Sequence, residues 1–392
     1  MKTANKKPYG HREYFAALDG FRGLLALCVA IHHTTWFSYL NYRSFINEGF
    51  VIIDLFFAFS GFLMYTLYQG KITDSASCKA FMQRRFARLY PIHLFMLIAF
   101  LGFAALRVLA HKTGIADHEA GEILPFASGA TDGWGSLLSN LTLTHSMGIH
   151  DSLTFNFPSW TISVEFFAYF VFMAMMVWVP PRKIWHFGFI AVLIGMTYWG
   201  LSRVKPNMDI TYDLGFFRCL GGFFTGVIAA WMYGKLKAKR VDNIASNMTK
   251  ATCIEVVVIA LSIFFVLYCK GKLQFFVAPV MLCFIMVFAF DGGWISRFMS
   301  LPIFRYLAKI SYSVYMVHAF IAIGFAIVGL RLFPDYLIAG NITYGAWGDL
   351  YNVPYLLCVI GVSHLTWKYV EVPGGKLLRG LKLSSFKAKL AA

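Results

Sequence analysis

The chain has 392 residues, of which 58% are hydrophobic, 18% are aromatic and only 14% are charged. A soluble globular domain has about 25% charged residues, so this composition excludes an ordinary soluble enzyme, an intrinsically disordered chain and a small disulfide-bonded scaffold. The formal net charge of +16 does not indicate nucleic-acid binding here, because membrane proteins collect Lys and Arg in their cytoplasmic loops.

Long apolar runs recur along the chain, and a transmembrane helix needs about 20 mostly apolar residues. They predict an all-α polytopic membrane protein with about ten spanning helices. The expected spans lie near residues 18–39, 49–68, 90–109, 158–179, 184–201, 213–233, 251–269, 274–290, 311–330 and 353–370. The corresponding regions are an N-terminal arm over 1–17, a membrane domain over 18–371 and a basic tail over 372–392.

Lys and Arg are distributed unequally between the two sides of this arrangement. The side that holds both termini carries 26 of them, and the opposite side carries 8. Because Lys and Arg are enriched in cytoplasmic loops, we expect both termini in the cytoplasm. The segment of about 110–157 is then an extracytoplasmic loop, and its length is typical of functional loops.

Ionisable side chains inside the spans are the first functional candidates, since placing them in lipid is costly. Arg22 and His33 are eleven residues apart in the first span, so they share a helical face, whereas His32 points about 100° away. The other candidates are Asp54, Glu165, Arg218 and His318. The expected spans place His33, Asp54, Glu165 and Arg218 at similar depths in the outer half of the membrane. A histidine, carboxylates and an arginine at one depth indicate a reaction centre or a transport site. For each residue alone, a polar tie between helices is an equally good interpretation.

The stretch QRRFARLYP (83–91) precedes the third span. Arg85 and Arg88 are spaced i, i+3 and lie on one helical face, and Arg84 adds a third guanidinium. Such groups bind phosphate oxygens in bidentate fashion. The simpler interpretation is anchoring at lipid head groups. A phosphate-bearing cytosolic donor is favoured because the pair lies below the polar residues of the membrane domain.

Several motifs along the chain together resemble the acyltransferase-3 family of integral membrane O-acyltransferases. An Arg, ten residues and a His, which is the family's opening pattern, selects Arg22 and His33. The motifs are ALDGFRGLLALCVAIHH (17–33), DLFFAFSGFLMY (54–65), the pair Arg85 and Arg88, SWTISVEFFAYF (159–170), SYSVYMVHAF (311–320) and SHLTWKYVEVP (363–373).

The resemblance implies transfer of an acyl group, usually acetyl, from cytosolic acyl-CoA to a hydroxyl of an extracytoplasmic or lipid-linked carbohydrate. It also implies a multi-pass plasma membrane protein, most naturally of a bacterial inner membrane. Some members carry a C-terminal SGNH-type esterase domain, which we expect this chain to lack. Either the membrane domain then acts alone or a separate periplasmic protein completes the transfer. Seven cysteines without metal-type spacing predict neither a metal site nor a disulfide.

Under this hypothesis His33 is the general base for the acceptor hydroxyl, or takes the acyl group as a transient intermediate. Glu165 orients His33 and stabilises its cation, and Arg22 holds the CoA arm or the thioester end of the donor. The donor phosphates are bound by Arg84, Arg85 and Arg88. The residues expected to bind the acceptor or tie helices together are Asp54, Trp160, Arg218 and His318. The alternative function is a proton-coupled small-molecule transporter that uses the same histidine and carboxylates.

Overall fold

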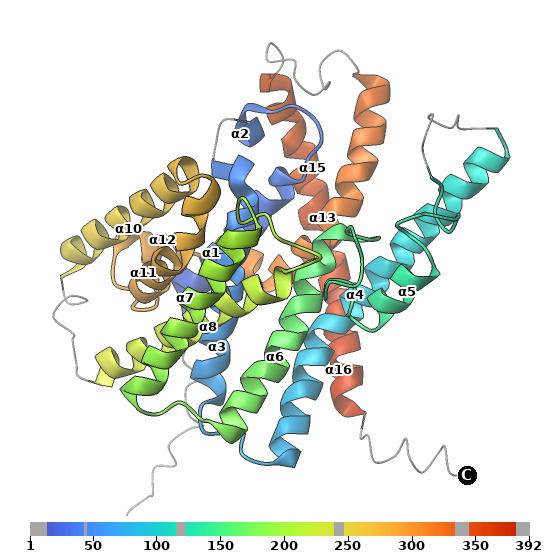
Figure 1. The fold of residues 1–392 in the computed structure, drawn as a ribbon. Helices are drawn as coiled ribbons and strands as arrows, with labels where there is room; N and C mark the ends of the chain where they lie inside the picture. Colours follow the sequence, from blue (N-terminus) through green and yellow to red (C-terminus); the bar gives the residue numbers. More distant parts are fainter. Residues whose placement is uncertain (1–13, 43–44, 115–122, 239–246, 334–344, 382–392) are drawn as a thin grey trace, which may run out of the picture.

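A computed structural model describes residues 14–42, 45–114, 123–238, 247–333 and 345–381, and no strand occurs among them (Figure 1). The α-helices are α1 (Ala16–His32), α2 (Tyr39–Tyr42), α3 (Gly49–Tyr68), α4 (Ser75–Lys112), α5 (Trp134–Leu141), α6 (Trp160–Trp178), α7 (Ile184–Val204), α8 (Gly215–Ala238), α10 (Met248–Tyr268), α11 (Val277–Phe288), α12 (Trp294–Met299), α13 (Pro302–Leu332), α15 (Gly345–Thr366) and α16 (Val372–Gly380). Three-residue to six-residue 3-10 turns and a π-helical turn, Trp367–Glu371, connect some of them.

A long helix lies at each of the ten predicted spans. In the described ranges, eight helical segments are long and apolar enough to cross a membrane. The remaining two predicted spans correspond to α1, which has 17 residues, and α15, which has 22. The class of all-α polytopic membrane protein is therefore confirmed.

Helix α4 begins much earlier than the predicted third span. The Asp74 side chain accepts a hydrogen bond from the backbone N–H of Ser77 at 2.8 Å, and the Ser77 hydroxyl accepts one from the backbone N–H of Asp74 at 3.0 Å. This capping box starts the helix at the end of the preceding loop. The basic pair of Arg85 and Arg88 thus lies inside α4 rather than at its first turn.

The predicted tail and loop both contain structure. Residues 372–380 of the tail form α16, which packs against α4. The contact is close because Pro91 cannot donate to the carbonyl of Ala87, and Gly375 lies over that carbonyl. Within the expected loop of 110–157, α4 continues to Lys112 and α5 forms. Residues 1–13, 115–122 and 382–392 of the arm, loop and tail lie outside the described residues.

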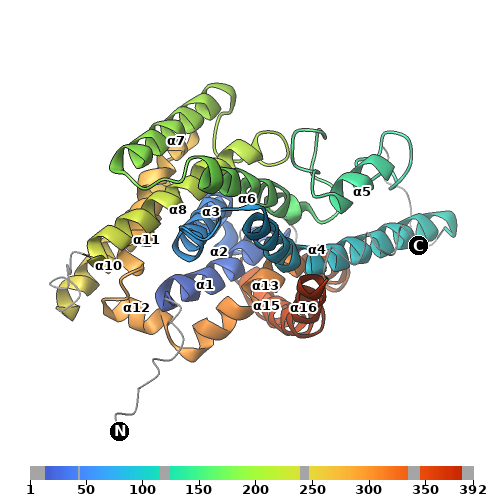
Figure 2. The ribbon, with the colours of Figure 1, turned by 90° about the horizontal axis from the view of Figure 1, so that it is seen from below.

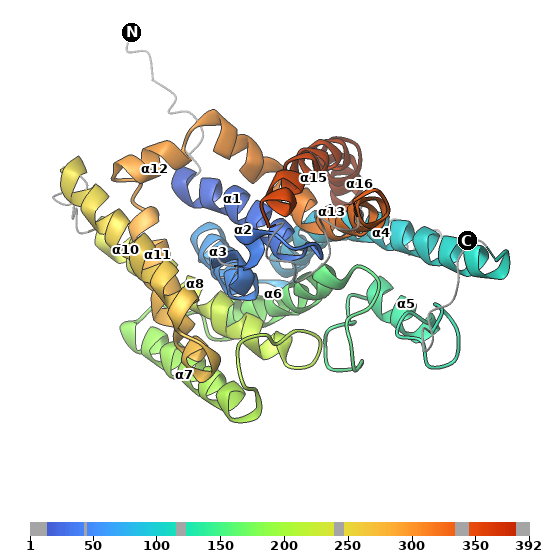
Figure 3. The ribbon, with the colours of Figure 1, turned by 90° about the horizontal axis from the view of Figure 1, so that it is seen from above.

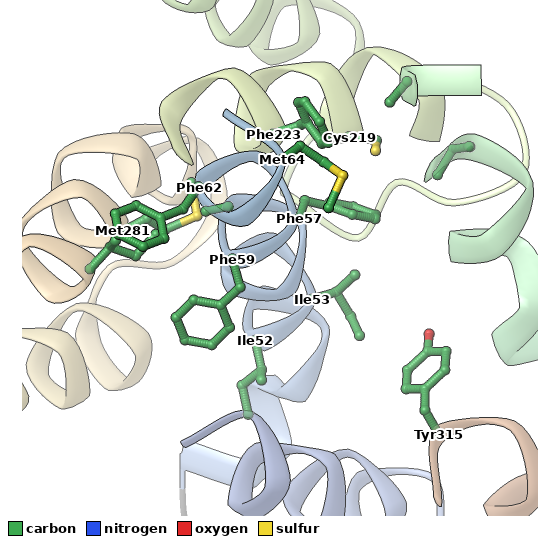
Figure 4. Packing of buried hydrophobic residues seen from close by; sticks show 14 of the residues in the cluster. Ile52, Ile53, Phe57, Phe59, Phe62, Met64, Cys219, Phe223, Met281 and Tyr315 are labelled. Atoms are coloured by element: carbon green, nitrogen blue, oxygen red, sulfur yellow. The ribbon is translucent and has the colours of Figure 1, made fainter. Parts of the chain in front are cut away.

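Helices α1 and α3 lie in the middle of the molecule when it is seen from below and from above (Figures 2 and 3). Helix α8 crosses α3 with backbone almost touching backbone, since a Cβ at Gly61 would overlap the carbonyl of Phe223 and one at Gly226 that of Ala58. In Figure 4, Phe59 and Ile53 leave α3 in different directions. Both belong to the apolar core and both line a cavity, and Ile53 faces the side of Tyr315, which lines the same cavity.

Candidate active site

A cavity between α1, α3, α4, α6 and α13 contains about 180 Å³ of space that water-sized groups can occupy. Apolar side chains of α3 form much of its wall, and polar groups from all five helices meet in it. These polar groups are Arg22, Ser60, Arg85, Arg88, Thr161, Glu165, Tyr169, Ser311, Tyr312 and Tyr315. The cavity therefore brings together four of the predicted site residues.

Glu165 is bonded to other cavity residues and not to His33. Its Oε1 accepts hydrogen bonds from the hydroxyl of Ser60 and, at 2.5 Å, from that of Tyr169. The Ser60 and Tyr169 oxygens are themselves 3.0 Å apart. The expectation that Glu165 orients His33 is therefore not met, and Ser60 and Tyr169 are partners that sequence reasoning missed. Both lie within the quoted motifs, but only the tertiary packing shows which polar residues meet.

A tyrosine organises the basic stretch of α4. The Tyr68 hydroxyl accepts hydrogen bonds from Arg84 Nε and Arg85 Nη2, each at 3.2 Å. The Arg85 guanidinium also lies 5.5 Å from the Tyr68 ring centroid and 5.9 Å from that of Tyr169. Within the described residues, Arg85 Nε is buried and has no hydrogen-bond partner. Arg85 lines the cavity with a donor still available, whereas Arg84 is not part of its wall.

Arg88 forms an ion pair with Glu371, which the sequence analysis did not single out. Glu371 ends the π-helical turn before α16, and its other carboxylate oxygen accepts a 2.7 Å hydrogen bond from the hydroxyl of Ser313. The Glu371 side chain is only 2% exposed, but that of Arg88 is 43% exposed and lies over the Tyr312 ring. Glu371 lies within the motif SHLTWKYVEVP, and this motif was the sequence feature that could have identified it.

Arg22 and His33 are separated by about two thirds of the length of α1. Arg22 lines the cavity and pairs with Asp19 at 2.9 Å. His33 caps the C-terminus of the helix and is not in the cavity wall. Eleven residues at 1.5 Å each place the two backbones about 16 Å apart along the helix axis. Although Arg22 and His33 share a helical face, their side chains do not contact the same residues.

His33 forms a pair with His318 of α13. The His33 Nδ1 atom lies 3.0 Å from His318 Nε2, and the two rings stack with centroids 5.0 Å apart. The edge of Phe157 packs against the His33 ring. His32 instead has its Nδ1 atom 2.9 Å from the carbonyl of Ile46. The two adjacent histidines thus have different partners.

Asp54, Trp160 and Arg218 form a third set of contacts. Both Asp54 and Arg218 are fully buried, and Arg218 Nη2 lies 2.6 Å from Asp54 Oδ2. The guanidinium also donates to the carbonyls of Ile210 and Phe50 and lies 5.5 Å from the Trp160 ring centroid. The Nε, Nη1 and Nη2 atoms of Arg218 all have partners within the protein, and neither charged residue lines the cavity. This geometry favours a tie between α3 and α8 over acceptor binding.

A second histidine pair lies beside α5, and no sequence motif indicated it. The rings of His93 and His145 stack with their planes 8° apart. His145 belongs to the segment between α5 and α6, where its Nε2 atom lies 3.1 Å from the Ser159 hydroxyl. Burial lowers the pKa of His145 to about 3, so its imidazole is neutral at physiological pH. Among the described residues, no group of three or more His, Cys, Asp or Glu side chains has an arrangement that could hold a metal ion.

The comparison with protein families gives this geometry a context. A family model described as an acyltransferase domain matches residues 15–365. The chain belongs to the acyltransferase-3 family. The matched region includes the cavity, the histidine pair and the buried ion pair of α3 and α8. Glu371 and α16 lie beyond it.

Relatives of this acyltransferase-3 protein are bacterial. A Staphylococcus aureus (strain MRSA252) protein named "Putative O-acetyltransferase SAR0937" is 22% identical over 99% of this chain and 61% of its own length. The "Peptidoglycan O-acetyltransferase OatA" of Listeria monocytogenes is 24% identical over 78% of this chain and 49% of its own length. The chain thus spans about three fifths of the first of these relatives. No solved structure gives a significant match.

Proposed function

We propose that this membrane domain transfers an acetyl group from acetyl-CoA, or another acyl-CoA, to a hydroxyl of an extracytoplasmic or lipid-linked carbohydrate. Membership of the acyltransferase-3 family and the names of the O-acetyltransferase relatives support this activity. The observation that carries the proposal is the cavity inside the helical bundle, because three arginines and a carboxylate meet there among apolar walls. Such a site suits a long anionic donor with an apolar arm.

The donor would bind at the arginine end of this cavity. Arg85 has a buried Nε without a partner in the described chain, and Arg88 is partly exposed beside it. Their guanidinium groups suit the phosphates of CoA. The pantetheine arm would then run past Arg22 between α3, α6 and α13 toward Tyr315, which lines the cavity and lies beside His318. Arg84 would contribute to donor binding indirectly, because it donates a hydrogen bond to the same Tyr68 hydroxyl as Arg85.

Glu165 takes a different role in this proposal from the one expected from sequence. It holds the hydroxyls of Ser60 and Tyr169 in the cavity wall, where they would line the path of the donor next to Arg85. His33 remains the base for the acceptor hydroxyl. His33 lies at the far end of α1 from Arg22, so the donor and acceptor would approach from opposite sides of the membrane.

The setting of the reaction follows from the family and its relatives. A bacterial inner membrane would place acyl-CoA on one side and the envelope carbohydrate on the other. The name of the Listeria relative specifies peptidoglycan, and we propose a cell-envelope carbohydrate of this general kind as the acceptor. A separate periplasmic transferase is needed only if the purified chain forms acyl-enzyme or binds donor without acylating the carbohydrate.

The test is acetyl transfer by purified protein supplied with radiolabelled acetyl-CoA and envelope carbohydrate. A charge-assisted hydrogen bond contributes about 1.5–3 kcal/mol, so Arg85→Gln should raise KM for acetyl-CoA about tenfold to hundredfold. Because this contact is similar in the ground and transition states, kcat should change little. Arg85 is a cleaner choice than Arg88, since removing Arg88 leaves the buried Glu371 unpaired.

Arg182→Gln is the matched control, because Arg182 is exposed and lies outside the cavity wall. It should leave KM for acetyl-CoA at the wild-type value. An unchanged KM in Arg85→Gln would remove the donor-binding role. Proton-coupled uptake of a solute by reconstituted protein, with no acetyl transfer, would replace the proposed function with transport.

A further inference from the structure

The hydrogen bonds around His33 and His318 determine where each ring carries its proton. His318 Nδ1 lies 3.2 Å from the carbonyl of Val314, and His33 Nδ1 lies 3.1 Å from the carbonyl of Val29. A carbonyl oxygen can only accept, so the hydrogen of each neutral ring lies on Nδ1. The Nε2 atom of each ring then carries a lone pair.

This assignment makes the contact between the two rings directional. His33 Nδ1 lies 3.0 Å from His318 Nε2 and 3.1 Å from the carbonyl of Val29, so its N–H is shared between that carbonyl and the lone pair of His318. His33 Nε2 is left as a hydrogen-bond acceptor, and no described residue occupies it. His33 is only partly buried, and we expect the acceptor hydroxyl to reach this atom. This is the arrangement that a general base requires.

We propose that His318 is the positioning residue for His33. It holds the His33 ring in the tautomer with a free Nε2 and shares the proton that His33 takes from the acceptor. This inference rests on the proposed acyl transfer. The acceptor O–H proton moves to His33 Nε2, the acceptor oxygen forms the new C–O bond to the acyl carbon, and the C–S bond of the thioester breaks. The imidazolium then returns its proton to the departing thiolate.

A carbonyl at Val29 cannot replace His318 in this role, because it accepts a hydrogen bond but cannot take up a proton. Once His33 is a cation, its Nδ1–H is bonded to a second imidazole that can share the charge. Tyr315 lies beside His318 with ring centroids 5.7 Å apart and also lines the donor cavity. The Tyr355 hydroxyl donates to the backbone carbonyl of His318 at 3.3 Å. The pair is thus fixed next to the cavity wall.

Two substitutions of His318 separate this role from packing. His318→Gln keeps an acceptor near the position of Nε2, and His318→Phe keeps the ring shape without one. Losing a charge-assisted hydrogen bond corresponds to about a tenfold to hundredfold effect. His318→Phe should therefore lower kcat by about that factor with KM for acetyl-CoA unchanged. His318→Gln, which accepts a hydrogen bond but cannot take up a proton, should recover only part of the loss. His32→Gln, the matched control, should keep the wild-type kcat.

The tautomer can be measured without turnover. In protein labelled with ¹⁵N-histidine, the nitrogen spectrum of wild type should show His33 with a protonated Nδ1 and an unprotonated Nε2. Absence of acetyl transfer in wild type would defeat the proposed function while this spectrum still tests the pair. A wild-type spectrum with the proton on His33 Nε2 would overturn the inference. Wild-type kcat in a folded His318→Phe protein would do the same.

Discussion

Two neighbouring histidines at the end of α1 illustrate how much the direction of a side chain matters. His33 is bonded to His318, and His32 is bonded to the carbonyl of Ile46. Positioned proton transfer contributes about 10²–10⁴-fold to rate, so His33→Ala should lose nearly all acetyl transfer. His32→Ala should keep a substantial fraction. Steady-state transfer by both purified variants checks this, and the reverse ranking in two folded proteins would contradict the assignment.

The stability of the segment around α5 should depend on pH through His145. Burial holds the pKa of this residue at about 3 in the folded protein, whereas an unfolded His has a pKa of about 6.5. The unfolded form therefore binds more protons at any pH between these values. The contribution of neutral, buried His145 to the free energy of unfolding is complete above about pH 6.5 and is lost progressively as the pH falls. Between pH 7.5 and pH 5 the loss is about 2 kcal/mol.

Thermal unfolding in detergent at the two pH values measures this effect. His145→Gln, whose amide can replace Nε2 opposite the Ser159 hydroxyl, is the control because it cannot take up a proton. The drop in Tm between pH 7.5 and pH 5 should be smaller in His145→Gln than in wild type. Equal drops in the two proteins would show that another group is responsible.

Residue types and spacing located part of the site. Arg22 and Glu165 were predicted from charge inside apolar spans, and Arg85 and Arg88 from their i, i+3 spacing before the third span. All four line the cavity. Their partners were not predictable in the same way. Glu371 is 283 residues from Arg88 along the chain, and no local pattern specifies such a contact. Similar depth in the membrane did not mean contact either, since His33, Asp54 and Glu165 belong to three different sets of contacts.

At the scale of elements, hydrophobic length predicted the spans well and their ends less well. A run of apolar residues marks the part of a helix that needs lipid or a core. It does not mark the first turns of α4, which are polar and begin at a capping box. The same limitation applies to α16, which is basic enough to be taken for a tail. Its close packing against α4 is possible because Gly374 and Gly375 fit against Pro91 and Ala87, and this contact is not visible in the sequence.

The crossing of α3 and α8 should tolerate no added side chain at its closest point. A Cβ at Gly226 would overlap the backbone of Ala58, which cannot move without moving α3. Overpacking costs about 1–3 kcal/mol, so Gly226→Ala should lower Tm. Gly234→Ala on the same helix meets nothing within 4 Å and should leave Tm unchanged or raise it, since Ala favours helix by about 1 kcal/mol. Equal Tm values for the two variants would contradict this account of the packing.

At the scale of the whole molecule, the arrangement separates the two proposed substrates. Arg85 and Arg88 lie toward the end of the bundle where α3 is joined to α4, and His33 lies at the opposite end of α1. A donor that enters beside α4 and an acceptor that approaches His33 would meet near Tyr315, which contacts both the cavity and His318. The direction of transfer then depends on how the bundle is oriented in the membrane.

The excess of Lys and Arg on one side predicts that orientation. Positive residues are retained in the cytoplasm, so the end of α8 should be cytoplasmic and the segment around α5 extracytoplasmic. In a cysteine-free background, Ser128→Cys should react with an impermeant thiol reagent added to intact cells. Lys235→Cys, at an equally exposed position near the end of α8, should react only after permeabilisation. Labelling in the opposite sense would place Arg85 and Arg88 outside, away from cytosolic acyl-CoA, and would reverse the proposed direction of acyl transfer.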